Sequence, residues 1–419
     1  MSSDTRPMSS HDTRPMGGHA EWSRAHIRAH VWVWMLLPAL LLSGCSTSTV
    51  KSTKHTPLLQ ETRALPPSQL LDVGVIALEP GLRPPKDETG ARDDTPATIR
   101  NAEGYYLANE LRGAIESSAG WGTVRLLPST TPVVDVYVSG RILQSDGETL
   151  EVEIEARDSA GTRWFRREYK EVASKYAYER REALGREPFA GLFNRIANDL
   201  LEHRRGLDGP ELAQLRTISE LRFAADFAPE SFAGHLGEDR RGVLEIRRLP
   251  AENDPTLAHI RTMRERDYQY IDTLQQYYDN FAGRMEEPYF TWRSQRYDEA
   301  LAARELRQQS LLRTAGGVAA VIAGVVLASN SNSSAGQLGG VAAVGAGAVM
   351  VQSGLQKRSE ARLHEAALEE LGDSLAADLR PRVVDLEDRT ITLTGNVQAQ
   401  YEQWRALLRE IYLAERAEL

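Results

Sequence analysis

The sequence predicts an α+β protein: a small α/β module with an antiparallel meander, followed by a mostly helical region with a Gly/Ala-rich helical hairpin. Three observations predict this class. Apolar and polar side chains alternate over residues 134–172 with the period of a strand. Apolar side chains recur at helical spacing over residues 98–118 and again after residue 255. Residues 314–356 hold two uncharged arms of small residues around a polar turn.

The N-terminal residues predict a secretory signal peptide. Basic residues precede an uncharged apolar stretch of about a dozen residues, and small residues follow it, which is the order that such signals share. Residues 2–8 are nearly repeated by residues 9–16, which indicates a short duplication. We therefore expect translation to begin at Met16, with Met8 as the alternative, and residues 1–44 to be absent from the mature chain.

The signal ends in Leu42-Ser43-Gly44-Cys45, which resembles the lipobox of bacterial lipoproteins. The resemblance implies cleavage between Gly44 and Cys45, diacylglycerol on the Cys45 thiol, and a further acyl chain such as palmitate on the new amino terminus. Several acyl chains hold a protein to a bilayer stably. In that family, Ser46 in place of Asp implies the outer membrane, on its periplasmic side. The alternative is a buried apolar segment with a chance cysteine. Residues 45–68 are polar and Pro-containing, and we expect a flexible lipidated tether.

An α/β module is predicted over residues 69–205. A mostly apolar run with a β-branched centre predicts its first strand, and a long loop follows over residues 79–95. The remaining elements are a helix, a second strand, three antiparallel strands and a closing helix. Their expected ranges are 98–118, 123–127, 134–143, 150–156, 163–172 and 189–201. This order of elements resembles the small α/β domains of periplasmic outer-membrane lipoproteins, such as the curli secretion lipoprotein. Such domains generally bind partners.

One face of the predicted meander is charged. Glutamates at 151, 153 and 155 lie on one strand and arginines at 163, 166 and 167 on the next. Opposite charges on neighbouring strands stabilise a sheet, so we expect cross-strand ion pairs. A catalytic pair of carboxylates is the alternative interpretation.

A helical region is predicted over residues 206–313. Asp208-Gly209-Pro210 predicts the start of one helix, and Asp254-Pro255 the start of a longer one, which Pro288 is expected to interrupt. The Gly- and Pro-containing residues 234–255 separate the two helices. The longer helix carries a mainly aromatic stripe at three- and four-residue spacing, which predicts a packing face. Its members are Tyr268, Ile271, Leu274, Tyr277, Tyr278 and Phe281.

Small residues recur every fourth position in both arms of the hairpin predicted over 314–356. They include Gly316, Ala320, Gly324 and Ala328 on the first arm and Gly339, Ala343 and Gly347 on the second. This spacing is typical of helices that pair closely in a bilayer. Charges flank only the outer ends of the hairpin, so both ends are expected on one side of a membrane. Each arm has about 15 apolar residues, fewer than the ~20 usually needed to span. A hairpin buried in the fold and a Gly/Ala linker are the alternatives.

A C-terminal α+β cap is predicted over residues 357–419. An amphipathic helix ends at Pro381, two short strands follow, and a last helix runs over 397–418. We expect this cap to pack on the helical region.

Composition excludes some classes of function. Without residues 1–44 the chain has 46 basic and 56 acidic residues, and such an acidic chain without a basic run does not suggest a nucleic-acid partner. The histidines lack metal-ligand spacing, and no nucleotide-binding or hydrolase motif occurs, so we expect no cofactor and no enzymatic activity. The sequence favours a periplasm-facing outer-membrane lipoprotein that assists envelope assembly or transport, with an envelope protein as partner and possible homo-oligomers. A lipoprotein that bridges to peptidoglycan or its synthases is the second hypothesis, and an envelope-polymer hydrolase is the third.

Overall fold

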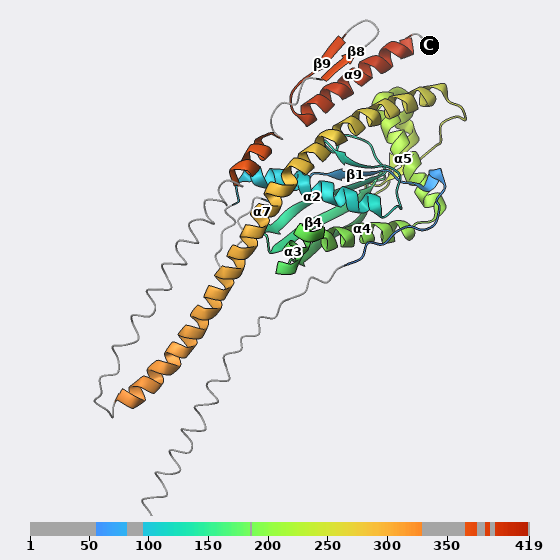
Figure 1. The fold of residues 1–419 in the computed structure, drawn as a ribbon. Coiled ribbons are helices and arrows are strands. Elements are labelled where there is room, and N and C mark those ends of the chain that lie inside the picture. The colour runs from blue at the N-terminus through green and yellow to red at the C-terminus, as the bar shows by residue number, and fades with distance from the viewer. Residues whose placement is uncertain are drawn as a thin grey trace, which may run out of the picture. The chain divides into compact units, whose positions relative to one another are not determined.

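The computed structural model describes residues 56–81, 95–184, 187–328, 365–374, 382–385 and 390–417. These residues form helices, a five-stranded mixed sheet and two small two-stranded sheets (Figure 1). The predicted α+β class is therefore confirmed. The domain boundaries drawn from the sequence stay a prediction.

The main sheet combines parallel and antiparallel strands. Its members are β1 (Val73–Ile76), β2 (Val124–Leu127), β3 (Val136–Ser145), β4 (Thr149–Asp158) and β5 (Arg163–Val172). They lie in the order β2-β1-β3-β4-β5, with β1 parallel to both neighbours and β3 to β5 forming the predicted meander. Val73 pairs with both Val124 and Val136, so the residues just before β1, β2 and β3 meet at the amino-terminal end of these parallel strands. There the amide of Asp72 donates to the Asp135 carboxylate at 2.8 Å.

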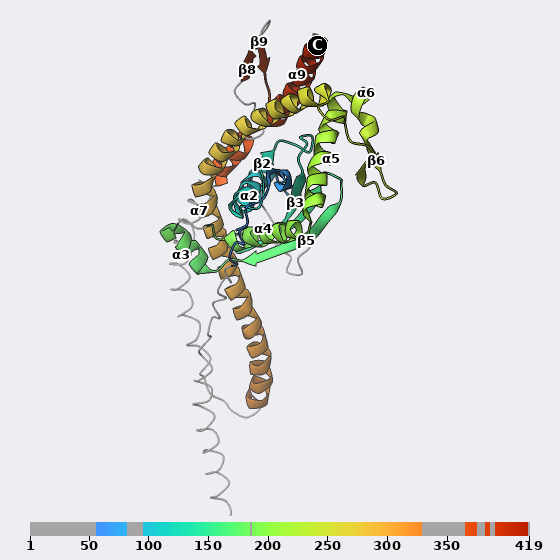
Figure 2. The ribbon, with the colours of Figure 1, turned by 90° about the vertical axis from the view of Figure 1, so that its right-hand side faces the viewer.

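Helices cover one face of this sheet. α2 (Ala97–Ser117) and α4 (Ala190–Arg205) pack on each other and on the sheet (Figures 1 and 2). α3 (Lys175–Leu184), which the sequence does not predict, lies between β5 and α4 in the chain. In β4 the residues facing the helices, such as Val152 and Ile154, are buried, whereas the glutamates between them remain partly exposed.

Helix α7 runs from Pro255 to Ala328 without a break. The predicted interruption at Pro288 is wrong. Proline removes one backbone hydrogen bond and crowds the preceding turn. The next turn is nevertheless held in place by buried contacts with the α/β module: the Tyr289 hydroxyl donates to Glu103, and Arg293 donates to Glu187 at 2.6 and 2.8 Å. The predicted packing face is confirmed, since most of its side chains are buried.

α7 also closes the free edge of β2. The side-chain amide of Gln275 donates to the carbonyl of Leu126 at 2.8 Å and accepts from its N–H at 2.9 Å. An edge strand otherwise presents unpaired backbone groups. Gln275 therefore occupies the place that a neighbouring strand would take.

α5 (Gly209–Phe227) connects the module to α7 through a short irregular segment. Asp208 caps α5 as the sequence predicts, in a reciprocal pair of hydrogen bonds with Glu211. The segment between α5 and α7 forms α6, a 3-10 turn η3 and a small hairpin that the sequence does not predict. Their bounds are Pro229–Phe232, Ala233–His235, Leu236–Glu238 for β6 and Leu244–Ile246 for β7.

The C-terminal residues pack on α7, as expected for the predicted cap. Residues 365–374 are helical, β8 (Arg382–Asp385) pairs with β9 (Thr390–Leu393), and α9 (Val397–Ala417) follows. The indole of Trp404 on α9 stacks on the ring of Tyr270 on α7, with centroids 4.8 Å apart.

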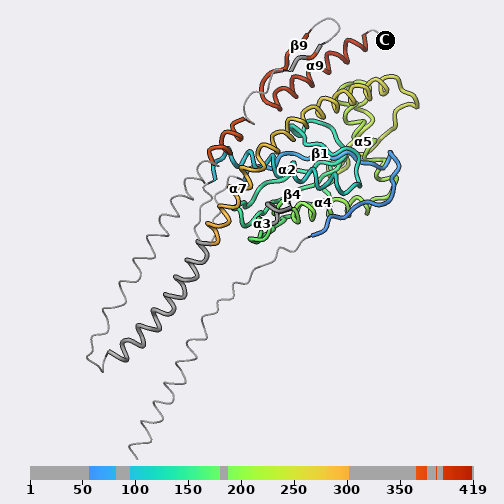
Figure 3. The backbone as a smooth tube through the Cα atoms, in the orientation of Figure 1, coloured from blue at the N-terminus to red at the C-terminus, as the bar shows by residue number. Residues whose placement is uncertain are grey.

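The N-terminal segment from Thr56 onward lies along α4 (Figure 3). The Thr56 carbonyl accepts from Asn194 at 2.8 Å, and the Leu59 N–H donates to Asn198 at 2.7 Å. The prediction of a flexible tether over 45–68 is therefore wrong for residues 56–68. Side chains on the flank of α4 satisfy the backbone of this segment, and η2 (Pro67–Gln69) leads it into the sheet.

Candidate functional site

The residues that the sequence assigns to a membrane function are only partly described. Cys45, Gly44 and the second-arm positions 339, 343 and 347 lie outside the described residues. Gly316, Ala320, Gly324 and Ala328 all lie in the helical backbone of α7, and their four-residue spacing puts them on one side of it. Among the described residues, no helix combines the length and apolarity needed to cross a membrane.

Both segments that lead to these positions leave the folded body at the same end. The segment toward Cys45 reaches Thr56 beside Asn194, in the first part of α4. Glu187, just before α4, forms a buried ion pair with Arg293 of α7. One turn further along α7, the ring of Tyr297 lies 5.4 Å from that of Tyr178 on α3. The start of α4, α3 and this part of α7 are therefore neighbours.

The turn between β3 and β4 lies at the same end. Gly147 has a positive φ of 81°, and a Cβ there would collide with the carbonyl of Arg293. The Tyr178 hydroxyl donates to the Gly147 carbonyl. A residue with a side chain would push α7 away, so glycine at this turn allows the helix to pass directly over the end of the sheet.

Glu61 fixes the N-terminal segment near the other end of α4. Its carboxylate accepts from Arg204 at 2.6 Å and from Arg205 at 3.1 Å. The backbone N–H of Arg63, together with the two arginines, holds the pKa of Glu61 below its ordinary value. The ionised form is thus the one that binds.

A polar pocket of about 390 Å³ lies at the amino-terminal end of the parallel strands. Four arginines and three carboxylates line it, together with Tyr268 and Gln269. The charged residues are Asp72, Arg125, Arg216, Arg261, Arg264, Glu265 and Asp272. The Tyr268 ring lies under two of the guanidiniums: its centroid is 4.4 Å from Cζ of Arg125 and 5.2 Å from Cζ of Arg264.

Most of the cations in this pocket already have partners. Arg125 donates to Asp272 at 2.6 and 3.1 Å, and Arg261 donates to Glu220 at 2.5 and 3.1 Å. Arg264 lies 3.8 Å from Asp135, whose pKa is raised by burial. Arg216 donates to backbone carbonyls at Pro67 and Leu70. These contacts join α5 and α7 to the end of the sheet and occupy donors of all four arginines.

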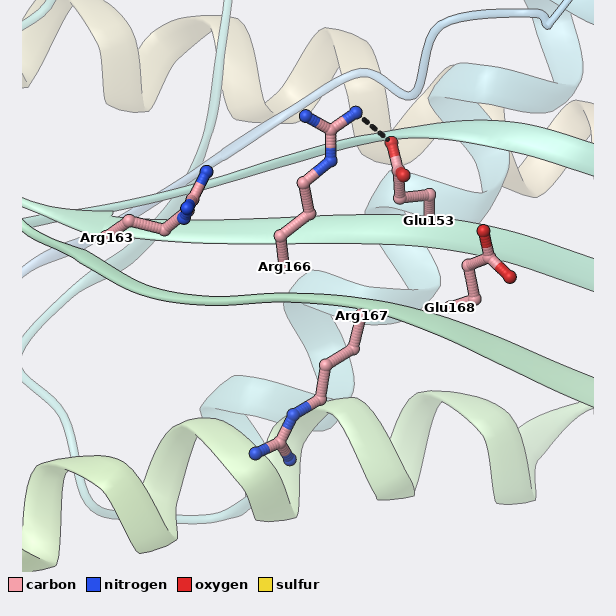
Figure 4. Close-up of a pocket in the computed structure, with 5 residues that line it drawn as sticks. All are labelled: Glu153, Arg163, Arg166, Arg167 and Glu168. Carbon is pink, nitrogen blue, oxygen red and sulfur yellow. Dashed lines mark hydrogen bonds and ion pairs between the residues drawn. The ribbon is translucent and has the colours of Figure 1, made fainter.

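The charged face of the meander carries a second, shallow pocket of about 530 Å³, lined by Glu153, Arg163, Arg166, Arg167 and Glu168 (Figure 4). Arg166 donates to Glu153 at 2.7 Å. Arg167 points to the other side of the sheet (Figure 4) and donates to Asp199 of α4 at 2.7 Å. The expected cross-strand pairing is confirmed for Glu153 and Arg166. The placement of Arg167 on the same face is wrong, because it pairs with Asp199 of α4.

This face is poorly suited to acid catalysis by Glu153. The hydrogen bond from Arg166 lowers the pKa of Glu153, and Arg141 acts in the same direction. A general acid requires the opposite shift, because it must hold its proton near neutral pH. The face is therefore a set of solvated ion pairs.

Sequence reasoning missed the docking of residues 56–63 on α4. A signal was present: Asn194 and Asn198 recur at four-residue spacing beside the apolar positions of α4. Amide side chains in that arrangement can pair with an extended backbone, because each offers a donor and an acceptor.

No cluster of histidine, cysteine or acidic side chains suited to a metal ion occurs in the described part of the chain. Comparisons of the chain with models of protein families, with curated proteins and with solved structures find no match.

Proposed function

We propose that this chain is an outer-membrane lipoprotein facing the periplasm, anchored by acylated Cys45, that acts without enzymatic activity as an accessory in envelope assembly or transport. We further propose that it self-associates through a small-residue hairpin over residues 314–356. An envelope protein would be its partner.

One observation carries the proposal: the segment that leads to Cys45 and the helix that leads to residue 314 leave the body at the same end. Asn194 holds Thr56 there, and the Glu187–Arg293 ion pair holds α7 there. A protein with two anchors in one bilayer needs this arrangement. Segments leaving from opposite ends would argue against it.

Chain lengths agree with a shared membrane. Thr56 follows Cys45 by eleven positions, and a chain of that length spans at most about 40 Å when extended. The α7 backbone continues as helix for 16 residues from Tyr297 to Arg313, about 24 Å at the usual rise. The apolar arm begins after Arg313. Both anchors can therefore reach the same bilayer while the body remains outside it.

Self-association follows from the residues at four-residue spacing in the first arm. Helices with small residues on one side approach closely in lipid, where packing drives association. A hairpin of this kind would gather several copies into a platform, and each copy would present its α/β module to partners.

The test is membrane flotation of a Cys45→Ser variant exported through a cleavable signal that does not direct lipidation. We expect it to float with membranes after a high-salt wash, because the hairpin remains. Adding Ile322→Arg in the middle of the first arm should release it, since an arginine there costs about 3 kcal/mol. The arginine variant with Cys45 intact is the control and should still float.

A soluble, monomeric Cys45→Ser protein would contradict the hairpin anchor. An unmodified Cys45 in the mass spectrum of the parent protein would contradict the lipoprotein assignment. For self-association, Gly324→Leu should lower the oligomer mass in detergent, and an unchanged mass would remove that part of the proposal.

A further inference from the structure

The two edges of the main sheet differ. Gln275 of α7 closes the edge formed by β2. β5 forms the other edge, where β4 is its only neighbour among the described strands. The backbone groups of β5 that point away from β4 therefore show whether this second edge is closed as well.

The pairing of β4 with β5 identifies these outward groups. The Ala173 N–H donates to the Glu148 carbonyl at 2.7 Å. Hydrogen-bonded pairs alternate with open pairs along an antiparallel ladder. Counting back along the register, the odd-numbered residues of β5 from 171 to 167 bond to β4. The N–H and carbonyl groups of Arg166 and Glu168 therefore point away from β4.

In the described part of the chain, no backbone group pairs with the outward groups of Arg166 and Glu168. The next outward carbonyl, that of Lys170, accepts from Arg195 of α4 at 2.8 Å, which agrees with the count along the register. An edge with unpaired donors and acceptors is a template for another strand. Because these groups recur at every second residue, about 6.8 Å apart, an extended backbone fits them.

The edge of β5 is also accessible. The shallow pocket of about 530 Å³ is lined by Arg166 and Glu168 and also by Arg167. Arg167 points to the other side of the sheet from Arg166 (Figure 4), so the pocket extends around the edge of β5. The side chains of Arg166 and Arg167 are 47 and 58% exposed. An added strand would lie in this position.

The charges along the edge define the chemistry of such a strand. Glu168 lies directly opposite Glu153 of β4, and like charges in that position destabilise a sheet. Glu153 pairs with Arg141 and Arg166 at 3.1 and 2.7 Å, whereas Glu168 has no cation partner in the described residues. Arg166 and Lys170 share a face with Glu168. A strand with a basic residue opposite Glu168, between two acidic residues, would complement all three.

We infer that the free edge of β5 binds an extended segment of a partner protein as a sixth, antiparallel strand, with a basic residue opposite Glu168 and acidic residues opposite Arg166 and Lys170. The inference rests on the proposed function, in which the α/β module meets an envelope protein, and adds the surface of that contact. Two copies joined through antiparallel β5 strands would be reversed end for end, so their anchors would point away from each other. A shared membrane therefore favours a different protein as the occupant.

Two synthetic peptides, blocked at both ends, test the edge on the full-length protein in detergent. The matched peptide is Thr-Val-Glu-Val-Lys-Val-Glu-Thr, and the comparison peptide has Glu in place of Lys. Fluorescence anisotropy of a dye on the peptide measures binding. Hydrogen exchange at single amides shows where the peptide lies: the amides of Arg166 and Glu168 are the reporters, and those of Arg167 and Tyr169, which already bond to β4, are the controls.

We expect the matched peptide to bind at least about fivefold more tightly than the comparison peptide, because only it places a cation opposite Glu168. It should slow exchange at 166 and 168 and leave 167 and 169 unchanged. Glu168→Lys should reverse the preference between the peptides. Glu168→Pro removes an outward N–H without taking a hydrogen bond from β4, and it should weaken the binding of both peptides.

Unchanged exchange at 166 and 168 with both peptides, or equal affinity for the two, would overturn the inference. Slower exchange at these amides when the protein alone is concentrated would also overturn it, because a second copy would then occupy the edge. These outcomes leave membrane flotation, and with it the proposed anchor, unaffected. A protein that binds the matched peptide but does not float would lose the anchor and keep the edge.

Discussion

Glu61 fixes the described N-terminal segment on the end of α4. Its ion pairs with Arg204 and Arg205 hold the last part of the segment that leads back to Cys45. The N–H of Glu61 also donates to the Ser118 carbonyl at 2.8 Å, which ties the segment to the end of α2. Release of this segment would free the residues before Glu61 from α4 without unfolding the core.

Acidification should release the segment around Glu61. Because the folded environment lowers the pKa of Glu61, its contribution to stability is present above its ordinary value of 4.5 and is lost as the pH falls below that value. Glu61→Gln should mimic the acidic state at neutral pH. Hydrogen exchange at the amides of Leu59 and Glu61 measures both effects, and we expect faster exchange in each case.

Glu202→Gln is the matched control for this prediction. Glu202 is an exposed carboxylate on α4, the helix that carries Arg204 and Arg205. It should leave exchange at Leu59 unchanged. If the Leu59 amide exchanges as slowly in the Glu61→Gln variant as in the parent protein, the asparagines of α4 suffice to hold the segment.

At the scale of elements, α7 covers the free edge of the sheet, because Gln275 pairs with the backbone of Leu126 on β2. Gln275→Ala should leave the N–H and carbonyl of Leu126 unpaired beside a helix that excludes water. The loss should be about 1–3 kcal/mol of unfolding free energy, and the exposed edge should increase aggregation on heating. Denaturant unfolding and light scattering measure the two effects.

Gln276→Ala serves as the control, because Gln276 is exposed on the same helix. It should change stability little. If the two variants unfold at the same denaturant concentration, water replaces the amide of Gln275 without cost.

Elements with a strong local pattern could be predicted from the sequence. The alternating residues of the meander and the Asp208 cap of α5 are examples, since each depends on contacts between residues close in the chain. The β6–β7 hairpin was not predicted, because its strands have only three residues each and are too short to show an alternating pattern. The continuity of α7 through Pro288 was not predicted either, because residues distant in sequence, such as Glu103, hold the helix there.

The candidate site could be predicted only where a motif is contiguous. Leu42-Ser43-Gly44-Cys45 carries the lipidation prediction by itself, and the small-residue spacing carries the hairpin, but both stay predictions. The departure of the N-terminal segment and of α7 from the same end depends on contacts such as Asn194 with Thr56, across 138 positions of the chain. The spacing of Asn194 and Asn198 indicates that α4 can bind an extended backbone, but it does not identify which segment of the chain is bound.

The whole molecule is joined by a core that crosses the predicted module boundaries. Apolar residues of β2, α5, α7 and α9 belong to one buried cluster. A buried ion pair reinforces it: Arg405 of α9 donates to Asp267 of α7 at 3.0 Å. Arg405 also donates to the more exposed Asp226 of α5. Burial raises the pKa of Asp267, against the opposing effect of Arg405. Such a pair is costly to break, because the remaining charge stays buried.

This continuity predicts a single cooperative unfolding transition for the described body, in place of separate transitions for module and cap. Trp121 and Trp164 report on the sheet side, and Trp404 reports on α9. In detergent, the fluorescence of a Trp404→Phe variant and of a variant that keeps Trp404 as its only tryptophan should follow the same denaturant midpoint and slope.

Asp267→Asn should shift both fluorescence transitions together to lower denaturant. The expected loss of unfolding free energy is about 3 kcal/mol, because the buried Arg405 loses its buried carboxylate partner. Loss of the Trp404 signal alone, at a denaturant concentration where the sheet tryptophans remain native, would contradict the shared core. The C-terminal cap would then be an independent unit, and its contacts with Tyr270 and Asp267 would contribute too little to couple it to the sheet.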